Sequence, residues 1–168
     1  MSSDVHSAEV RSRNMAAIKA RDTKPELILR SALHSSGLRY RLHVRKLPGT
    51  PDLVLRKHGA VIFVHGCFFH GHQCPAFKWP KNNAVFWRGK IQGNRKRDRT
   101  ATAELLNKEW RVLTVWECAL CGPGRRELPA VVQSVRRWLQ SGASERTITG
   151  VPPRKGRPKW PRRRRHPR

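Results

Sequence analysis

The sequence predicts an α/β fold in which a mixed sheet is flanked by helices and a loop is held against the core by a zinc ion. Two patterns predict the α/β class: helical segments at 24–36 and 127–140, and short apolar runs between them. Two close pairs of cysteines predict the zinc site. With 168 residues, the chain has room for one domain with a core.

A helix is predicted over residues 24–36. Thr23 and Glu26 have the spacing of a capping box, and Pro25 lies in the expected first turn. An apolar stripe follows until Gly37, which is typical of the residue just after a helix.

Strands are predicted in four segments. Residues 38–45 alternate apolar and polar side chains, which is typical of a strand with one face in water. Residues 52–56 and 60–64 are short apolar runs separated by a turn, and they predict a hairpin that enters the core. Residues 111–116 predict a further buried strand.

The remaining segments complete the order α-β-β-β-α-β-α. Residues 66–83 contain so much Gly, Pro, Cys and His that we expect an irregular loop supported by metal. A helix is expected at 94–108, with a possible helical start at 86–91, and a last helix is expected at 127–140 with one apolar face. The apolar residues of that face are Leu128, Val131, Val132, Val135, Trp138 and Leu139.

Positive charge dominates the composition. Lys and Arg number 36 against 11 Asp and Glu, a formal charge of +25, which favours a polyanionic partner such as nucleic acid. Nine of these basic residues lie in 151–168, a stretch without any acid. We therefore expect a domain at 23–142 and a disordered basic tail at 143–168. Residues 1–22 show no core periodicity, and we expect this segment to be mobile. No apolar run approaches the roughly 18 to 20 residues that span a membrane, and we expect a cytoplasmic protein.

The cysteines favour a metal site over disulfides, because a reducing cytosol disfavours disulfides. Cys67, His72 and Cys74 lie close together, and Cys118 and Cys121 follow the expected strand 111–116. Three close ligands and one distant ligand could hold Zn²⁺ in a closed tetrahedral site, which would be structural. Either later cysteine could be the fourth ligand, or both could bind and displace His72. The alternative is that these residues are core thiols and surface histidines.

A possible hydrolytic site lies on the predicted hairpin. Asp52 stands at the start of its first strand, where PD-(D/E)xK nucleases carry an aspartate that binds Mg²⁺. The second acidic residue and the lysine of that motif are absent, and His65 and His70 occur instead. A neutral imidazole can accept a proton from water near pH 7. The alternative role of Asp52 is to cap the turn before the strand.

Several segments together resemble the very short patch repair endonucleases, bacterial enzymes that nick DNA at T:G mismatches left by deamination of 5-methylcytosine. These segments are RSRNMAAIKARDTKPE, PGTPDLVLRKHGAVIFVHGCFFHGHQC, the Phe86-Trp87 pair and WRVLTVWECAL. The similarity covers about residues 8 to 140 and leaves out Cys121 and the tail.

The resemblance implies a restriction-endonuclease-like core, catalytic Mg²⁺ and one structural Zn²⁺. Asp52 matches the family's metal-binding aspartate and His70 its catalytic histidine, while His65 and Glu26 match supporting residues. At Val64, where the family often has threonine, only the backbone carbonyl could help to bind Mg²⁺. The number of Mg²⁺ ions is therefore left open. The residues that match the zinc ligands are Cys67, His72, Cys74 and Cys118.

The resemblance also implies how DNA is held. Phe68, Phe69 and Trp87 would form a wedge beside the mismatch, because a mispaired step is easier to distort than a paired one. We expect Phe86 to face the core. In the family, the N-terminal segment folds over the DNA, and the residues expected to do so here are Arg13, Asn14, Met15 and Lys19.

The expected activity is Mg²⁺-dependent nicking of one strand of double-stranded DNA, 5′ to the thymine of a T:G mismatch. We expect a monomer in the bacterial nucleoid, with downstream repair proteins as possible partners. Two alternatives remain: a restriction-type endonuclease that cuts matched DNA, and a noncatalytic DNA-binding module supported by zinc.

Overall fold

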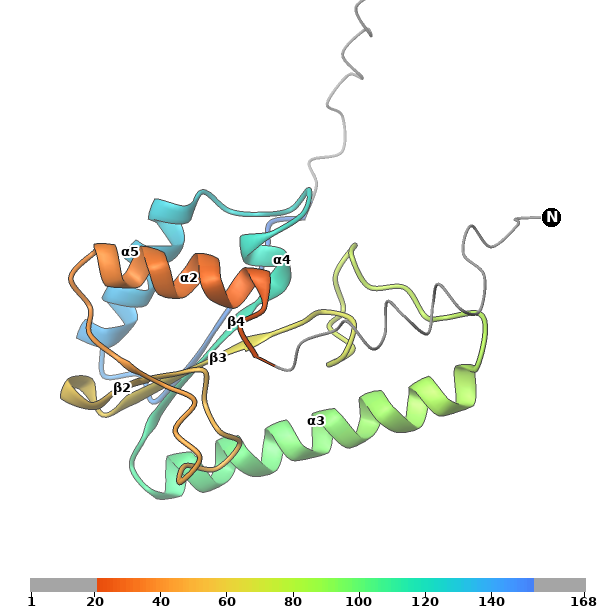
Figure 1. The fold of residues 1–168 in the computed structure, drawn as a ribbon, viewed down its shortest axis with the longest axis horizontal. Helices are drawn as coiled ribbons and strands as arrows, with labels where there is room; N and C mark the ends of the chain where they lie inside the picture. Colours follow the sequence, from red (N-terminus) through yellow and green to blue (C-terminus); the bar gives the residue numbers. More distant parts are fainter. Residues whose placement is uncertain (1–20, 153–168) are drawn as a thin grey trace, which may run out of the picture.

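The computed structural model describes residues 21–152, in which five strands form one mixed sheet (Figure 1). The strands are β1 (Arg41–Leu42), β2 (Leu53–Leu55), β3 (Ala60–His65), β4 (Arg111–Trp116) and β5 (Glu145–Ile148), and they lie in this order across the sheet. The first three are antiparallel neighbours, and β3, β4 and β5 are parallel. The predicted hairpin between β2 and β3 is confirmed, with Val54 opposite Val61.

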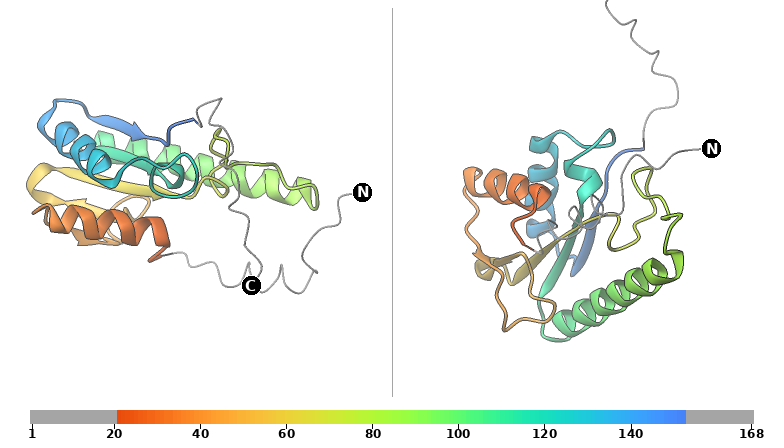
Figure 2. Two further views of the ribbon diagram at one scale, coloured as in Figure 1. Left: turned by 90° about the horizontal axis from the view of Figure 1, so that it is seen from above. Right: turned by 45° about the vertical axis from the view of Figure 1, so that its right-hand side comes forward.

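Helices cover both faces of the sheet (Figures 1 and 2). The helices are α2 (Lys24–Ser35), α3 (Ala84–Asn107), α4 (Glu117–Leu120) and α5 (Leu128–Gln140), and a single 3₁₀ turn, η1 (Arg56–His58), joins β2 to β3. Along β3, Ala60 and Ile62 pack with α2 and α5, whereas Val61 and Phe63 pack against Leu105 of α3. This alternation follows from the two-residue period of a strand.

Helix α3 connects the parallel strands β3 and β4, and such strands require a long crossover. Its N-terminal half runs beyond the sheet, next to the irregular segment 66–83 (Figure 1). Because β3 and β4 are parallel, their carboxyl ends, His65 and Trp116, lie side by side. The segments after these two strands therefore meet at one edge. Within residues 21–152, no helix is long and apolar enough to cross a membrane.

The helices differ from the prediction at their ends and in the short helix α4, which the sequence did not predict. Helix α2 ends at Ser35, and Gly37 adopts the left-handed conformation (φ 90°) that closes its end. The helical segments expected at 86–91 and 94–108 belong to one helix, α3, which continues through Gly93. A glycine within a helix costs only about 1 kcal/mol, which the hydrogen bonds on either side outweigh.

The strand predicted over 38–45 is wrong for most of its length. Only Arg41 and Leu42 pair with β2, and both are exposed. His43 has a φ of 46°, in the left-handed region, and this residue ends the strand.

The boundary predicted for the basic tail is also wrong. Residues 145–148 form β5 beside β4, and Ile148 belongs to the core. The domain therefore extends past residue 142. Because three of the four residues of β5 are exposed, its sequence carried little apolar signal. The tail beyond residue 152 and the segment 1–20 lie outside the described residues.

Candidate active site and metal centre

Asp52 lies just before β2 and faces the neighbouring strand. Its Oδ2 accepts a hydrogen bond of 2.7 Å from the backbone N–H of Val64 in β3. This contact crosses the hairpin, so the carboxylate is not occupied in capping its own turn. Burial raises the pKa of Asp52 to about 6, partly offset by the Val64 hydrogen bond, while the nearby Glu26 carboxylate raises it further. The ionised Asp52 carboxylate therefore lacks enough nearby positive charge to offset its burial.

His65 and His70 stand beside this carboxylate. His65 ends β3, and His70 lies in the turn that follows; their rings stack with centroids 4.0 Å apart and planes 5° apart. Burial, with the neighbouring His70, lowers the pKa of His65 to about 4, so His65 is uncharged at neutral pH.

Asp98 of α3 completes the group and was missed in the sequence. Its Oδ2 lies 2.5 Å from Nδ1 of His70, and its Oδ1 lies 3.9 Å from Nε2 of His65. Asp98 is the first acidic residue after Asp52 along a strongly basic chain. The scarcity of acidic residues could have indicated that Asp98 is a site residue. A position inside a predicted helix, however, does not reveal which loop the side chain faces.

A pocket of about 450 Å³ brings these groups together. Its lining includes Asp52, Val64, His65, His70 and Asp98. The aspartate and the two histidines singled out from the sequence thus share one cavity. It has a carboxylate on one wall and a hydrogen-bonded imidazole on another.

Glu26 lies in α2 outside this lining. Its side chain is only 2% exposed, and its Oε1 lies 3.3 Å from Nη1 of Arg30 and 3.1 Å from Nε2 of His43. The capping box is not confirmed: Thr23 is the N-cap residue but makes no side-chain cap hydrogen bond. Burial beside a cation and an imidazole explains the place of Glu26 better than capping does.

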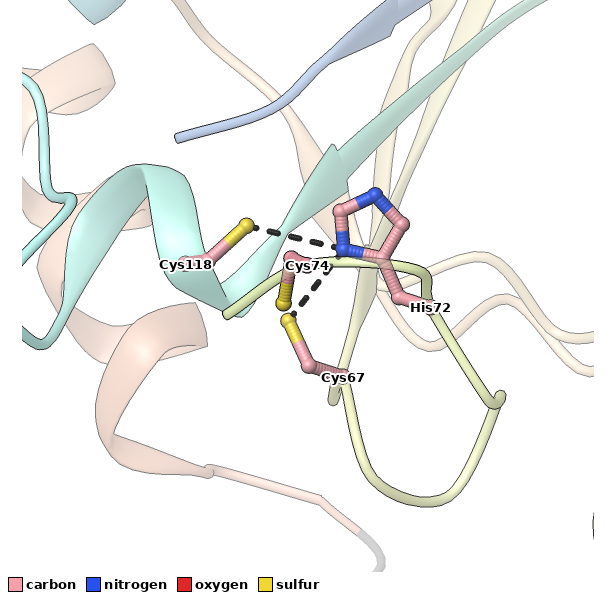
Figure 3. Close-up of side chains that lie close together, drawn as sticks. All are labelled: Cys67, His72, Cys74 and Cys118. Atoms are coloured by element: carbon pink, nitrogen blue, oxygen red, sulfur yellow. Dashed lines mark hydrogen bonds between the residues drawn. The ribbon is translucent and has the colours of Figure 1, made fainter. Parts of the chain in front are cut away.

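Cys67, His72, Cys74 and Cys118 converge at the edge where β3 and β4 end (Figure 3). Nδ1 of His72 is 3.5 Å from Sγ of Cys67 and 3.6 Å from Sγ of Cys118, and one ligand atom from each of the four lies within 4.8 Å of every other. The cluster could hold a metal ion.

The surroundings of the cluster fit this role. The ring of His72 stacks on Trp116 at 4.1 Å, which fixes its orientation. Burial raises the pKa of the Cys67 thiol, so a cation would be needed to hold it as a thiolate at neutral pH. Three sulfurs and one imidazole nitrogen are a donor set typical of Zn²⁺. Cys121 is not part of the cluster.

The aromatic residues expected to form the wedge lie together. Phe68 contacts Phe69 with ring centroids 5.2 Å apart, and contacts Trp87 at the start of α3 at 4.9 Å. The expectation that Phe86 faces the core is wrong, because Phe86 is 59% exposed. The N-terminal half of α3 projects beyond the sheet, so that turn of the helix has no core to face (Figure 2).

The expected DNA-contacting residues of the N-terminal segment, Arg13, Asn14, Met15 and Lys19, lie outside the described residues.

Known proteins resemble this chain closely. The family model of the DNA mismatch endonuclease Vsr matches residues 3–76. The DNA mismatch endonuclease Vsr of Escherichia coli (strain K12) is 44% identical over 147 residues, which cover 87% of this chain and 94% of that protein. The type II nicking enzyme V.XorIIP of Xanthomonas oryzae pv. oryzae is 46% identical over 113 residues, 67% of this chain and 83% of that enzyme. The type II nicking enzyme V.NmeAIP of Neisseria meningitidis is 41% identical over 117 residues, 70% of this chain and 84% of that enzyme.

The relatives named here are all endonucleases or nicking enzymes, and the first covers nearly the whole chain. Their shared activity is the cleavage of DNA. The chain therefore belongs to the Vsr family of DNA mismatch endonucleases.

Proposed function

We propose that the chain nicks one strand of double-stranded DNA 5′ to the thymine of a T:G mismatch, in a reaction that depends on Mg²⁺. The observation that carries the chemistry is the pocket in which Asp52 faces the stacked pair of His65 and His70. The mismatch preference is supported by the Vsr relative and by the aromatic group beside the pocket.

A single carboxylate suits Mg²⁺ at this pocket, because Mg²⁺ commonly keeps several waters and takes further ligands from substrate phosphate. Asp52 and the carbonyl of Val64 are the groups that would hold it. When bound, the ion would supply charge stabilisation for the scissile phosphate and for the leaving 3′ oxygen.

His70 would act as general base. As an ionised carboxylate, Asp98 can only accept a hydrogen bond, so Nδ1 of His70 carries the proton and Nε2 remains free to accept one from water. His65, uncharged at neutral pH, is a possible second acceptor beside it. Glu26 would support the site from behind Asp52.

The Cys67, His72, Cys74 and Cys118 cluster would hold structural Zn²⁺ and fix the loop that carries His70. The loop also carries Phe68 and Phe69, so one ion would set both the catalytic base and the wedge. We expect the protein to act as a monomer, with later repair steps left to other proteins.

Affinity that does not depend on sequence would come from basic side chains, and it should weaken by roughly 0.9 log unit per log unit of salt for each phosphate neutralised. The segment 1–22 and the basic tail would add such contacts.

A nicking assay tests this function. Duplexes that differ only by one T:G or C:G pair are incubated with the protein, with and without added Mg²⁺. We expect a single nick, on the thymine strand, only in the mismatched duplex and only with Mg²⁺. Equal cleavage of both duplexes would indicate a restriction-type endonuclease. Binding without any nick would indicate a noncatalytic module.

A further inference from the structure

His43 lies between the buried carboxyl group of Glu26 and the partly buried carboxyl group of Asp52. On one edge of its ring, Nε2 is 3.1 Å from Oε1 of Glu26, in a geometry that makes no hydrogen bond, and on the other edge Nδ1 is 3.9 Å from Oδ1 of Asp52. Both are electrostatic contacts rather than hydrogen bonds. The side chain is 15% exposed and lines the same pocket as Asp52. An imidazole has nitrogens on both edges and can therefore face two carboxylates at once.

The backbone of His43 is tied to Asp52 as well. Its N–H donates a hydrogen bond of 3.3 Å to the carbonyl of Asp52. The residue adopts a φ of 46°, a conformation that costs energy for residues other than glycine and is tolerated best by asparagine and aspartate. Strained backbone of this kind tends to persist where the surrounding structure requires a particular side-chain position.

The need of the buried Glu26 carboxylate for a partner does not by itself explain the position of His43. Arg30, one turn further along α2, already lies 3.3 Å from Oε1 of Glu26 and supplies a permanent positive charge. What His43 adds is the link from Glu26 to Asp52. Oδ2 of Asp52 is held by Val64, and His43 is the side chain that lies against Oδ1.

We propose that His43 is a positioning residue that orients the Asp52 carboxylate through its ring and backbone, with the buried Glu26 against the opposite edge of the ring. The proposal rests on the proposed function in one respect: it assumes that Asp52 is the metal-binding carboxylate. Loss of the ring would leave the Val64 N–H as the remaining contact that orients the carboxylate, and Oδ1 could then turn away from the metal. Groups that support a metal ligand in this way typically contribute roughly 10- to 100-fold in metal affinity or activity.

The test variant is His43→Asn, because asparagine tolerates the left-handed backbone but is too short to link the two carboxylates. The matched control is His58→Asn, the same change in the η1 turn, outside the pocket. His43→Gln is a second variant, whose longer amide can still reach one carboxylate. If His43→Asn does not fold, His43→Gln is measured in its place.

Two measurements are made on the full chain bound to a T:G duplex. The first is the Mg²⁺ concentration that gives half-maximal nicking, which we expect to rise roughly 10-fold or more in His43→Asn, less in His43→Gln, and not in His58→Asn. The second is Mn²⁺ binding, followed by electron paramagnetic resonance after subtraction of the signal of an Asp52→Asn complex. It should weaken in parallel with the first.

The outcomes separate the two proposals. An unchanged Mg²⁺ requirement and unchanged Mn²⁺ binding in His43→Asn, even with a lower melting temperature, would show a merely structural role and overturn the inference. If the wild-type protein does not nick, the proposed function fails, and the Mn²⁺ signal alone then decides on His43. Mn²⁺ binding that does not depend on Asp52 would overturn the inference as well.

Discussion

Nδ1 of His70 lies 2.5 Å from Oδ2 of Asp98, although the two residues come from different segments, the loop after β3 and the middle of α3. The contact determines which ring nitrogen of His70 carries the proton. It also anchors the loop that carries His70 to a long helix, so the position of the proposed base depends on how α3 packs.

Replacing Asp98 by Asn should slow nicking sharply. The amide can donate to Nδ1, which favours the tautomer with its proton on Nε2 and removes the acceptor for water. We expect a loss of roughly 100-fold or more in the single-turnover rate at saturating protein. Glu104→Gln, an exposed acid-to-amide change in the same helix, is the control and should keep the wild-type rate. A wild-type rate in Asp98→Asn would exclude this role.

Asp52→Asn should abolish nicking yet stabilise the fold at neutral pH. Since burial raises the pKa of Asp52 from 3.8 to about 6, the folded state binds this proton more tightly than the unfolded state does. The resulting stability is fully present below pH 3.8 and is lost as pH rises through about 6. The neutral amide avoids that loss, which amounts to about 3 kcal/mol at most.

The measurement is the free energy of unfolding in denaturant at pH 5 and pH 7.5, on zinc-loaded protein without added Mg²⁺. The advantage of Asp52→Asn over wild type should grow from pH 5 to pH 7.5. Glu145→Gln, an exposed carboxyl of β5, should show no such growth. If the difference in free energy of unfolding between Asp52→Asn and wild type became smaller as pH rises, it would contradict a raised pKa of Asp52.

Much of this site could be predicted from the sequence, because strand periodicity located the hairpin. That periodicity placed Asp52 and His65 on adjacent strands of one sheet, and the pocket confirms that they lie together. Local spacing likewise brought Cys67, His72 and Cys74 close. Spacing alone could not choose between Cys118 and Cys121, because the choice depends on where the side chains in and after a short helix point. The resemblance pointed to Cys118, and the structure places Cys118 in the cluster.

The rest depended on contacts between distant segments. Asp98 reaches His70 because α3 packs against one face of β3, and no local sequence pattern encodes that packing. His43 was expected to be the polar face of a strand, yet its left-handed backbone turns it towards Glu26. Strand β5 is too exposed to show apolar alternation in its sequence. Its position in the fold is determined by its pairing with β4.

Trp87→Ala should weaken mismatch recognition more than general DNA binding. The ring packs against Phe68, so its loss removes a stacking surface and loosens the neighbouring ring. Loss of one stacking ring costs roughly 1–3 kcal/mol, and this should appear as a lower ratio of T:G to C:G affinity in a fluorescence titration. Val85→Ala, which removes an 85% exposed apolar residue two positions earlier in α3, is the control. Equal weakening on both duplexes would assign Trp87 to nonspecific binding.

Cys118→Ser and Cys121→Ser should have opposite outcomes despite their proximity in sequence. Cys118 belongs to the four-residue cluster and Cys121 does not, so only the first change should remove a metal ligand. We expect one zinc ion per chain in the wild type and in Cys121→Ser, measured by atomic absorption, and a large loss of zinc from Cys118→Ser. Because the ion would join the loop after β3 to α4, its loss should lower the melting temperature and disorder the loop that carries His70. Retention of zinc by Cys118→Ser together with its loss from Cys121→Ser would reassign the fourth ligand, and absence of zinc from all three proteins would remove the metal from this site.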